Sequence, residues 1–412
     1  MINSKRAGVL LAMLLVGGCQ VHPGGGGVVH LRFSGYAGNP AETDLVAKLV
    51  TEFNRSHPGI HVVYEPVPGQ YYSKLLAMLV SHAAPDVFYL DVAQFRPLLS
   101  KHVLEPLDAF VARSRTTRRH DFVGSLVRAF SAKGHLYGIP KDFNTLALFY
   151  NKTLFDRAQQ PYPDATWTLA RLRRAAIALT RPQARPPQYG FALTDGDPDR
   201  YIPIAREFGA ALFDARGDCT IASPAGIGAL SWYAGLAGKD GCAVYPSEVG
   251  SSWTGDVFGR QQAAMVFEGG WLIPYLARAY PGVRYGTTEL PAGPAGRSNF
   301  LFTVAYAMPK ACRHKAAAWK LISYLTSSAA EAQVTFAVPS RKAASARYAE
   351  QHPRYRAILA GARYARPFAF GPEGGRVVDR LGEAVQKVFL GASSPRRALL
   401  AAAAGIAAIG GQ

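Results

Sequence analysis

Strands and helices alternate regularly over the first part of the chain. Apolar Val29, Leu31 and Phe33 alternate with polar residues, which predicts a strand with one buried face. The segment 39–59 follows, with apolar residues at helical spacing and a Pro-Gly pair at its end, which predicts a helix. The next predicted elements are a strand at 60–67, a helix at 71–82 and a strand at 85–91. This order predicts parallel strand pairing with helices on the sheet faces.

The ends of these strands carry the first candidate binding residues. In open α/β sheets, ligands bind beyond the carboxyl ends of the strands. The residues that occupy those positions are Tyr36, Gln70, Tyr71 and Asp91. We therefore expect these four side chains to line a ligand site.

The alternation continues less regularly along the rest of the chain. Further strands are predicted at 145–151, 189–193, 263–269 and 300–308, and nearly everything after residue 310 reads as helix. The Ala-rich tail 398–411 is too short to span a bilayer, so we expect a terminal helix that packs on the body. The fold class predicted from these patterns is α/β.

The N-terminal segment has the layout of a secretory signal. Lys5 and Arg6 precede an apolar stretch that ends in small residues and Cys19. The sequence "LVGGC" resembles a bacterial lipobox, in which the cysteine is acylated and begins the mature protein. We therefore predict a lipoprotein signal peptide at 1–18, lipidation of Cys19 and a flexible tether at 19–27. The alternative is an ordinary signal peptide with an accidental cysteine.

Three further cysteines follow Cys19. An exported protein can form disulfides, and Cys219 and Cys242 flank one predicted helical stretch. We predict that these two cysteines are paired. Cys312 is then a lone thiol, which we expect to be buried rather than reactive.

The chain is basic, with a formal net charge of +18. Removing residues 1–18 removes Lys5, Arg6 and no acid, which leaves +16. Such a charge suits nucleic acid, anionic lipid or an anionic ligand. The densest basic run, 113–120, lies between predicted helices and is typical of a solvated loop. We therefore predict no nucleic-acid partner.

Motifs for catalysis or for a cofactor are missing from the sequence. It contains no GxxxxGK[ST], HExxH, GxSxG or CxxC pattern. His57 and His61 are separated by a Pro-Gly pair, so they do not share a helix face. Asp195 and its acidic neighbours could supply a carboxylate for glycoside chemistry, although such acids more often stabilise a turn. We predict no metal, no cofactor and no enzymatic activity.

The stretch "MVFEGGW" places Gly269 and Gly270 directly before Trp271. Two interpretations are open. The glycines could form a tight turn over a buried tryptophan, or they could let a ligand reach the backbone while the indole ring stacks on it.

Several phrases occur in one order along the chain: "EFNRSHPGIHVVYEPVP", "APDVFYLD", "HLYGIPKDFNTLALFYNKTLFDRA", "TWTLARL", "AAMVFEGGWLIP" and "AAWKLISYLTSSAAEAQ". Together they resemble the family 1 extracellular solute-binding proteins, the maltose-binding-protein-like receptors of ABC importers. The resemblance extends over roughly residues 28 to 400. It implies a two-lobed periplasmic-binding-protein fold, in which each lobe is a mostly parallel sheet flanked by helices and the ligand lies in the cleft between them.

The resemblance also implies how the chain is divided. It would cross between lobes near "KDFN", "FLFTV" and "FAVPS". Lobe 1 would contain 28–143 and 302–337, and lobe 2 would contain 144–301 and 338–412. Hinge closure around the ligand would then be recognised by the permease subunits of an importer. The protein would be a monomer held at the cell membrane, on its periplasmic or outer surface.

The resemblance assigns candidate ligand contacts residue by residue. In addition to Tyr36 and Gln70, they are Tyr71, Asp91, Asn144, Asp195, Gly269, Gly270 and Trp271, followed by Arg341 and Arg376. The sequence departs from the family pattern at "SNFLFTVAY", where Tyr306 is expected to reshape one wall of the cleft. Glycines at "PEGGR" replace a common tryptophan, so that end of the cleft would be less aromatic.

The expected ligand is a sugar or an oligosaccharide. A glycerophosphodiester or another phosphorylated polyol is the alternative within the family, because the body is basic. A lipid-anchored glycoside hydrolase is the alternative from another class, and Asp91 with Asp195 is the carboxylate pair it would need. Basic charge would also suit a nucleic-acid-binding surface protein, whose binding would depend steeply on salt.

Overall fold

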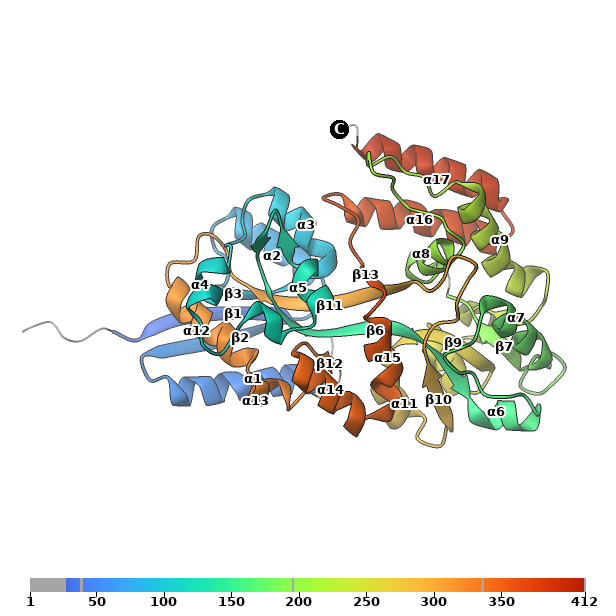
Figure 1. The fold of residues 1–412 in the computed structure, drawn as a ribbon, viewed down its shortest axis with the longest axis horizontal. Coiled ribbons are helices and arrows are strands. Elements are labelled where there is room, and N and C mark those ends of the chain that lie inside the picture. Colours follow the sequence, from blue (N-terminus) through green and yellow to red (C-terminus); the bar gives the residue numbers. More distant parts are fainter. Residues whose placement is uncertain (1–26, 38–39, 195, 335–336, 411–412) are drawn as a thin grey trace, which may run out of the picture.

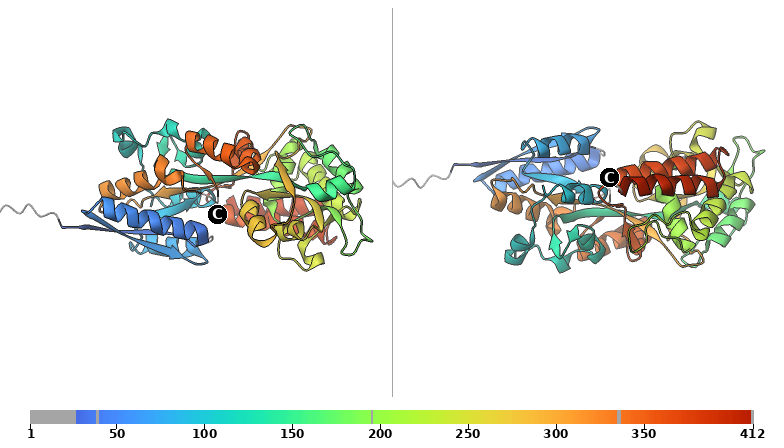
Figure 2. Two further views of the ribbon diagram at one scale, coloured as in Figure 1. Left: turned by 90° about the horizontal axis from the view of Figure 1, so that it is seen from below. Right: turned by 90° about the horizontal axis from the view of Figure 1, so that it is seen from above.

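The computed structural model describes residues 27–37, 40–194, 196–334 and 337–410 (Figure 1). The predicted signal peptide, the tether and Cys19 lie outside the described residues, and so does Asp195. Two lobes of mixed α/β structure lie side by side and are joined by long strands, as the two further views also show (Figure 2). The predicted two-lobed α/β fold is confirmed.

The first lobe contains the predicted succession of strands and helices. Its parallel strands are β1 (Val29–Tyr36), β2 (Ile60–Val67) and β3 (Val87–Asp91). Its helices are α1 (Pro40–Ser56), α2 (Tyr71–Val80), α3 (Val92–Ser100), α4 (Asp108–Arg113), α5 (Gly124–Ala129), α12 (Lys315–Leu325) and α13 (Ser328–Glu331). A short hairpin, β4 (Ser131–Ala132) and β5 (His135–Leu136), completes this lobe.

The second lobe is built in the same way around a smaller set of strands. These are β7 (Tyr189–Ala192), β8 (Ala243–Val244), β9 (Ala263–Gly269) and β10 (Tyr285–Thr288). The helices are α6 (Lys152–Arg157), α7 (Leu169–Ala178), α8 (Pro198–Glu207), α9 (Pro224–Gly238), α10 (Thr254–Gly259), α11 (Leu272–Ala279), α16 (Gly374–Phe389) and α17 (Pro395–Gly410). The tail therefore forms the expected terminal helix, which packs on α16 and α9.

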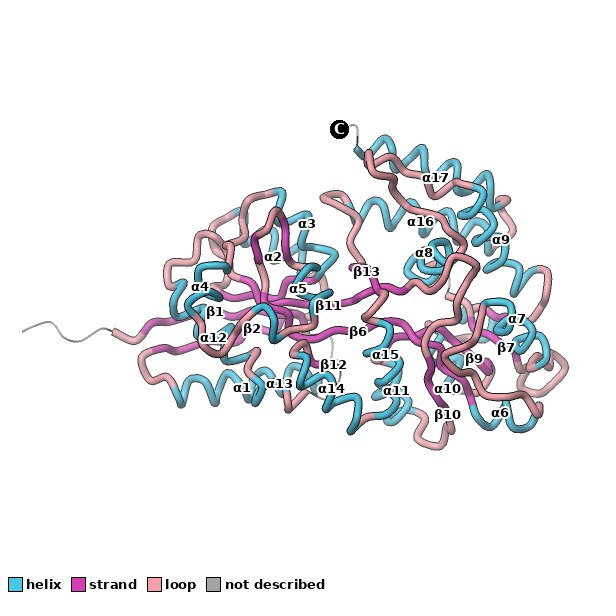
Figure 3. The backbone as a smooth tube through the Cα atoms, viewed as in Figure 1, coloured by secondary structure: helices cyan, strands magenta, loops and turns pink. Residues whose placement is uncertain are grey.

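Two strands run through both lobes and connect them (Figure 3). They are β6 (Ile139–Asn151) and β11 (Asn299–Ala307), and they pair with each other in antiparallel fashion. The strand order across the molecule is β2-β1-β3-β11-β6-β9-β7-β8. The sheet is therefore parallel within each lobe and antiparallel around the two connecting strands.

The partner of β6 changes along its length. Its first part pairs with β11 as far as Thr145, and the part from Leu146 onward pairs with β9 of the second lobe. This change lies next to the predicted crossing at "KDFN". The remaining elements near the connection are β12 (Val338–Pro339), β13 (Ala365–Pro367), α14 (Lys342–Gln351) and α15 (Arg356–Gly361). The residue-by-residue division of the chain between lobes stays a prediction.

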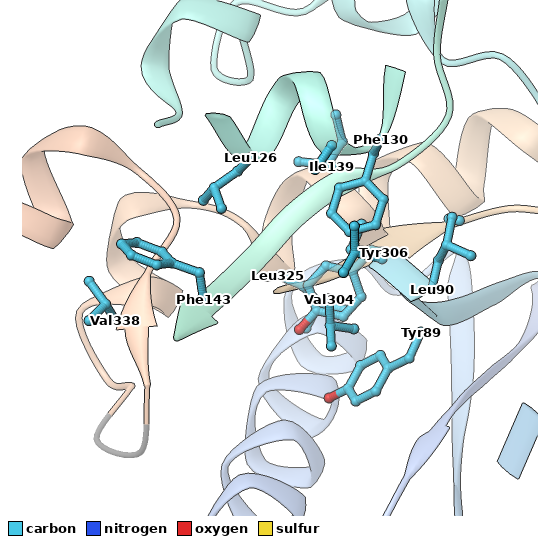
Figure 4. Packing of buried hydrophobic residues seen from close by; sticks show 14 of the residues in the cluster. Tyr89, Leu90, Leu126, Phe130, Ile139, Phe143, Val304, Tyr306, Leu325 and Val338 are labelled. Carbon is cyan, nitrogen blue, oxygen red and sulfur yellow. The ribbon is translucent and has the colours of Figure 1, made fainter. Parts of the chain in front are cut away.

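Two large apolar clusters fill the interior of the described residues. In the first lobe, Tyr89, Val304 and Tyr306 lie together among aliphatic and phenylalanine side chains (Figure 4). A second cluster lies against the strands of the second lobe, with Trp167 and Tyr201 among its largest buried residues. Burial of apolar surface stabilises each lobe at about 25 cal/mol per Å². The first cluster continues from the first lobe into the second, where Leu272 and Leu276 of α11 belong to it, whereas the second cluster lies in the second lobe.

The predicted Cys219–Cys242 disulfide is wrong, because both residues are free thiols in the structure. They lie beyond opposite ends of α9, a helix of 15 residues. A helix of that length is roughly 22 Å long, whereas a disulfide requires Cα atoms within about 7 Å. Cys312 is buried, as expected, and its thiol donates to Asp86 Oδ1 at 3.4 Å.

Candidate functional site

Two carboxylates flank one residue of the connecting strand β11. Val304 pairs with Asp91 of β3 on one side and with Asp142 of β6 on the other. Directly opposite residues of neighbouring strands project from the same face of a sheet, so both acids lie on one face. Burial raises the pKa of Asp91 to about 6, and the charge of Asp142 adds to that rise, although a hydrogen bond from the Ala93 backbone N–H opposes it.

The same face continues toward the second lobe. Phe302 and Asn144 lie two residues along their strands from Val304 and Asp142, and they pair with each other. Side chains two residues apart share a face of a strand. The name junction face is used here for the surface formed by Asp91, Asp142, Asn144 and Phe302.

Asn144 has an unused acceptor on the junction face. Its Oδ1 atom is buried and has no hydrogen-bond partner among the described residues. Leaving such a group unpaired costs about 1–3 kcal/mol, so native structures rarely contain one without a reason. A hydroxyl or N–H group of a ligand would satisfy it.

Trp271 lies against the junction face from the second lobe. Its ring meets Phe302 edge to face, with centroids 5.5 Å apart, and Phe302 in turn lies 5.4 Å from Phe368. All three rings are partly exposed. They form an aromatic surface at the point where the lobes meet, next to the carboxylates and the amide of the first lobe.

The two glycines before Trp271 are explained by close packing. A Cβ on Gly270 would lie 2.3 Å from Asn144 Oδ1, and a Cβ on Gly269 would lie 2.3 Å from the Trp271 ring. Neither position has room for a side chain. The glycines therefore seat Trp271 and Asn144 beside each other, and the indole ring stays partly exposed rather than fully buried as a tight turn alone would require.

A buried charged network holds Trp271 in place. Trp271 Nε1 donates to Glu268 Oε2 at 2.7 Å, and the same oxygen accepts from Arg200 Nη2 at 2.9 Å. Arg200 also pairs with Asp199 and donates to the Phe267 carbonyl at 3.0 Å. Burial raises the pKa of Asp199 to about 6, although Arg200 opposes that rise. Two acids thus share a single arginine.

The first lobe repeats this arrangement around a lysine. Lys141 Nζ donates to Glu42 Oε1 at 2.7 Å and pairs with Asp142, and all three residues are buried. The register between β6 and β11 shifts at this point, which is a β-bulge. A bulge redirects side chains, and here it lets the sequence neighbours Lys141 and Asp142 meet. Burial is the largest influence on Asp142 and raises its pKa.

Tyr36 borders the same group of charges. Its ring lies 5.3 Å from that of Tyr89, and burial raises its pKa, followed by the charge of Glu42. The structure therefore brings together five predicted residues, namely Tyr36, Asp91, Asn144, Gly270 and Trp271, with Gly269 behind the ring. Gln70 is exposed at the start of α2, and no hydrogen bond of the described residues involves its side chain.

Tyr71 and Tyr306 do not lie where the sequence placed them. Tyr71 is 4% exposed and its hydroxyl donates to the Ser34 carbonyl and accepts from the Tyr89 N–H, so it supports the sheet rather than a rim. Tyr306 is 2% exposed, beneath the Lys141 group of charges. Both side chains are buried, and their predicted ligand contacts stay predictions.

The two arginines predicted for the cleft have other roles. Arg341 is buried in the first lobe, where its side chain donates to the Thr326 and Thr116 carbonyls and to Asp121. Its guanidinium also lies 4.9 Å from the centre of the Phe122 ring. Arg376 is exposed in the first turn of α16 and pairs with Glu373 at 3.7 Å. Neither arginine supplies a cation to the junction face.

Glu331 is a buried acid next to Arg341, and it gives a pH-dependent prediction. It accepts from Ser340 and from the Arg341 backbone N–H, yet burial raises its pKa to about 7. The pKa of Glu331 is higher in the folded protein than in the unfolded chain, so protonation of this carboxyl favours folding. The free energy of unfolding should therefore rise as the pH falls from 8 toward 5. Urea unfolding should therefore show wild type gaining about 2 kcal/mol relative to Glu331→Gln over this range. A stability difference between the two proteins that does not change with pH would contradict this prediction.

Sequence analysis missed Glu42, Lys141, Asp142, Arg200 and Glu268. The signal for three of them was present, since "KDFN" was recognised as a crossing and "MVFEGGW" contains Glu268. The sequence did not indicate which residues far apart along the chain pair with each other, nor that a bulge brings Lys141 beside Asp142. Among the described residues, no group of three histidine, cysteine or acidic side chains is placed to bind a metal ion.

No helix of the described residues combines the length and apolar character needed to cross a bilayer.

Comparison with known proteins identifies the family. The family model described as bacterial extracellular solute-binding protein matches residues 38–332. A putative binding protein from Brucella abortus is 24% identical over 372 residues, which cover 85% of this chain and 86% of that protein. The arabinooligosaccharide-binding protein of Bacillus subtilis is 21% identical over 334 residues, or 78% of this chain and 75% of that protein.

A solved structure supports the same fold. The ABC substrate-binding protein from Listeria monocytogenes in complex with cycloalternan superimposes with a TM-score of 0.83 at 22% identity, covering 93% of this chain and 99% of that one. The extent of the family match, together with two lobes joined by β6 and β11, leads to one conclusion. The chain belongs to the family of bacterial extracellular solute-binding proteins.

Proposed function

We propose that this protein is the substrate-binding component of an ABC import system that captures a sugar or an oligosaccharide and delivers it to the membrane permease. The observation that carries this proposal is the junction face with Trp271 against it. Sugar hydroxyls donate hydrogen bonds to carboxylates and amide oxygens, which Asp91, Asp142 and Asn144 supply. The apolar face of a sugar ring packs on a flat aromatic, which Trp271 supplies.

Capture by hinge closure follows from the position of these groups. The acids belong to strands of the first lobe, and Trp271 is the N-cap residue of α11 in the second. A ligand that touches both sets interacts more strongly with the closed arrangement than with the open one. That difference in affinity would drive the lobes together about β6 and β11, and the closed form would signal occupancy to the permease.

A phosphorylated polyol fits this site less well than a neutral sugar. The two cations near the junction face, Lys141 and Arg200, are each shared between two acids. A phosphate would need donors that are free to form charge-assisted bonds, and it would be repelled by the surrounding carboxylates. The basic charge of the whole chain therefore does not extend to this site.

Binding without catalysis is the expected behaviour. The family consists of solute-binding proteins, and the hydrolase alternative depends on Asp195, which lies outside the described residues. Purified protein should therefore release no product from a glycoside that it binds. Steady turnover would favour the hydrolase instead.

A screen by thermal shift tests the ligand class. Purified protein would be heated with simple sugars, oligosaccharides, sugar phosphates and glycerophosphodiesters in turn. A true ligand at one hundred times its Kd stabilises the fold by about 2.7 kcal/mol, so a sugar hit should raise Tm by several degrees. Stabilisation by the phosphorylated compounds alone would replace the sugar proposal with its alternative.

Anchoring through Cys19 completes the proposal. The mature protein would be exported, lipidated at Cys19 and held as a monomer beside the permease. Cys19→Ala should abolish lipidation, so a lipid-specific mass increase seen on the wild-type protein should be absent from the variant. Ligand binding should persist, because the described fold begins after this residue. A wild-type protein without that mass increase would contradict the anchor.

A further inference from the structure

A basic cavity lies at the outer end of the first lobe, away from the junction face. Its volume is about 460 Å³. Histidines enter it from the start of β1, from the ends of α2 and α3 and from the segment before α12; they are His30, His82, His102 and His314. Lys310 and Arg313 line it as well. The term basal cavity is used for this space.

The positive charge of the basal cavity is hardly neutralised. Asp86 is the only acid in its lining, and its carboxylate accepts from the Arg32 backbone N–H at 3.0 Å and from the Cys312 thiol at 3.4 Å. Within the described residues, Lys310 and Arg313 form no side-chain hydrogen bond and no ion pair. Two permanent cations therefore face the cavity without a partner of their own.

These side chains suit an oxyanion and not a metal ion. Imidazole N–H groups, an ammonium and a guanidinium are all hydrogen-bond donors, and the planar fork of an arginine matches phosphate oxygens. Lysine and arginine would repel a cation. The described residues also lack a group of three metal-ligating side chains in suitable positions, despite the four histidines.

The position of the basal cavity indicates where its oxyanion comes from. An adjoining cavity of about 520 Å³ shares Arg313 and His314 with it, contains Lys315 and Lys320, and reaches Val29, where β1 begins. Figure 1 places the start of β1 at the end of the first lobe that is remote from the second lobe. Val28 is nine positions after Cys19, which corresponds to at most about 30 Å of extended chain.

We propose that the basal cavity binds the phosphate of an anionic phospholipid headgroup and seats the first lobe on the membrane. This rests on the proposed anchoring at Cys19, because the short connection keeps this end near the lipid. Two exposed apolar residues are sequence neighbours of lining residues, Val28 of Val29 at 49% exposure and Val80 of Leu79 at 68% exposure. Basic groups beside an exposed apolar edge are suited to the interface of an anionic leaflet.

Vesicle sedimentation tests the proposal with protein that begins at residue 20, which keeps every described residue and lacks the lipid. It should sediment with vesicles of phosphatidylcholine containing 30% phosphatidylglycerol at low salt, and not with phosphatidylcholine alone. The double variant Lys310→Gln/Arg313→Gln should bind about thirtyfold more weakly, since two basic groups are lost at the surface. Equal binding by wild type and this variant would overturn the proposal.

A matched control separates a specific site from general basicity. Arg174→Gln/Arg278→Gln removes the same charge from exposed positions of the second lobe, and it should change vesicle binding less than twofold. An equal loss of vesicle binding in both double variants would show that net charge alone attracts the protein to the vesicles, which would contradict a specific site in the basal cavity. Calorimetric titration with inorganic phosphate is the third measurement. Tight binding of free phosphate by a protein that does not bind vesicles would rule out a lipid headgroup as the ligand of the basal cavity. Sugar binding by all variants should stay unchanged, so this proposal and the proposed function fail separately.

Discussion

Lys141→Met is expected to lower the free energy of unfolding by about 3–5 kcal/mol, because it leaves Glu42 and Asp142 buried without their shared cation. Lys141, Glu42 and Asp142 are each less than one-tenth exposed, so solvent cannot replace the lost pairing. Urea unfolding at pH 8 measures the change. The loss should shrink as the pH falls, since burial raises the pKa of Asp142 and its protonation removes one of the two unpaired charges.

Lys48→Met is the matched control for this prediction. Lys48 pairs with Glu52 at 3.9 Å on the surface of α1, and its side chain is 60% exposed. Exposed pairs of this kind contribute about 0–1 kcal/mol. If both variants lost the same small amount of stability, the charged group on the junction face would be no more than a surface ion pair.

Trp271→Ala is expected to weaken ligand binding about thirtyfold or more. A central aromatic of a binding site commonly loses about 2 kcal/mol of binding energy on truncation. The fold should lose less, about 1–2 kcal/mol, because the ring is partly exposed and its contacts include one hydrogen bond to Glu268, an edge-to-face contact with Phe302 and the Arg200 guanidinium 6.0 Å from its centre. Calorimetric titration and urea unfolding of the same variant measure the two effects.

Trp319→Ala provides the comparison for the loss of an indole ring. Trp319 is also partly exposed, and it stacks on Phe110 with centroids 5.7 Å apart on the outside of the first lobe. It should lose a similar amount of stability and no affinity. A Trp271 variant that binds as well as this control would show that "MVFEGGW" only shapes a turn.

Local patterns were sufficient to predict most of the fold. Alternation in 29–33 and helical spacing in 39–59 placed β1 and α1, because one face of each element is buried and the other is solvated. The strands at 189–193, 263–269 and 300–308 match observed ones to within one residue, and 145–151 is the second half of β6, which begins six residues earlier at Ile139. The Cys219–Cys242 pairing failed for a geometric reason, since flanking a helix in sequence means being separated by its length in space.

The site was only partly predictable, because it depends on register. Asp91 and Asn144 could be proposed from strand ends and from the family resemblance, yet their shared face follows from how β3, β11 and β6 align. The bulge that brings Lys141 beside Asp142 leaves no mark in the local sequence. Conversely, Arg341 looked like a ligand contact in sequence, and tertiary packing buries it against Phe122.

Small-angle X-ray scattering with and without a sugar identified by thermal shift tests the central claim most directly. Capture between lobes that close about β6 and β11 predicts a smaller radius of gyration at saturating sugar. Trp271→Ala should need a correspondingly higher sugar concentration for the same compaction, whereas Trp319→Ala should respond as wild type does. A scattering profile that stays unchanged at saturating sugar would contradict capture by closure of the two lobes.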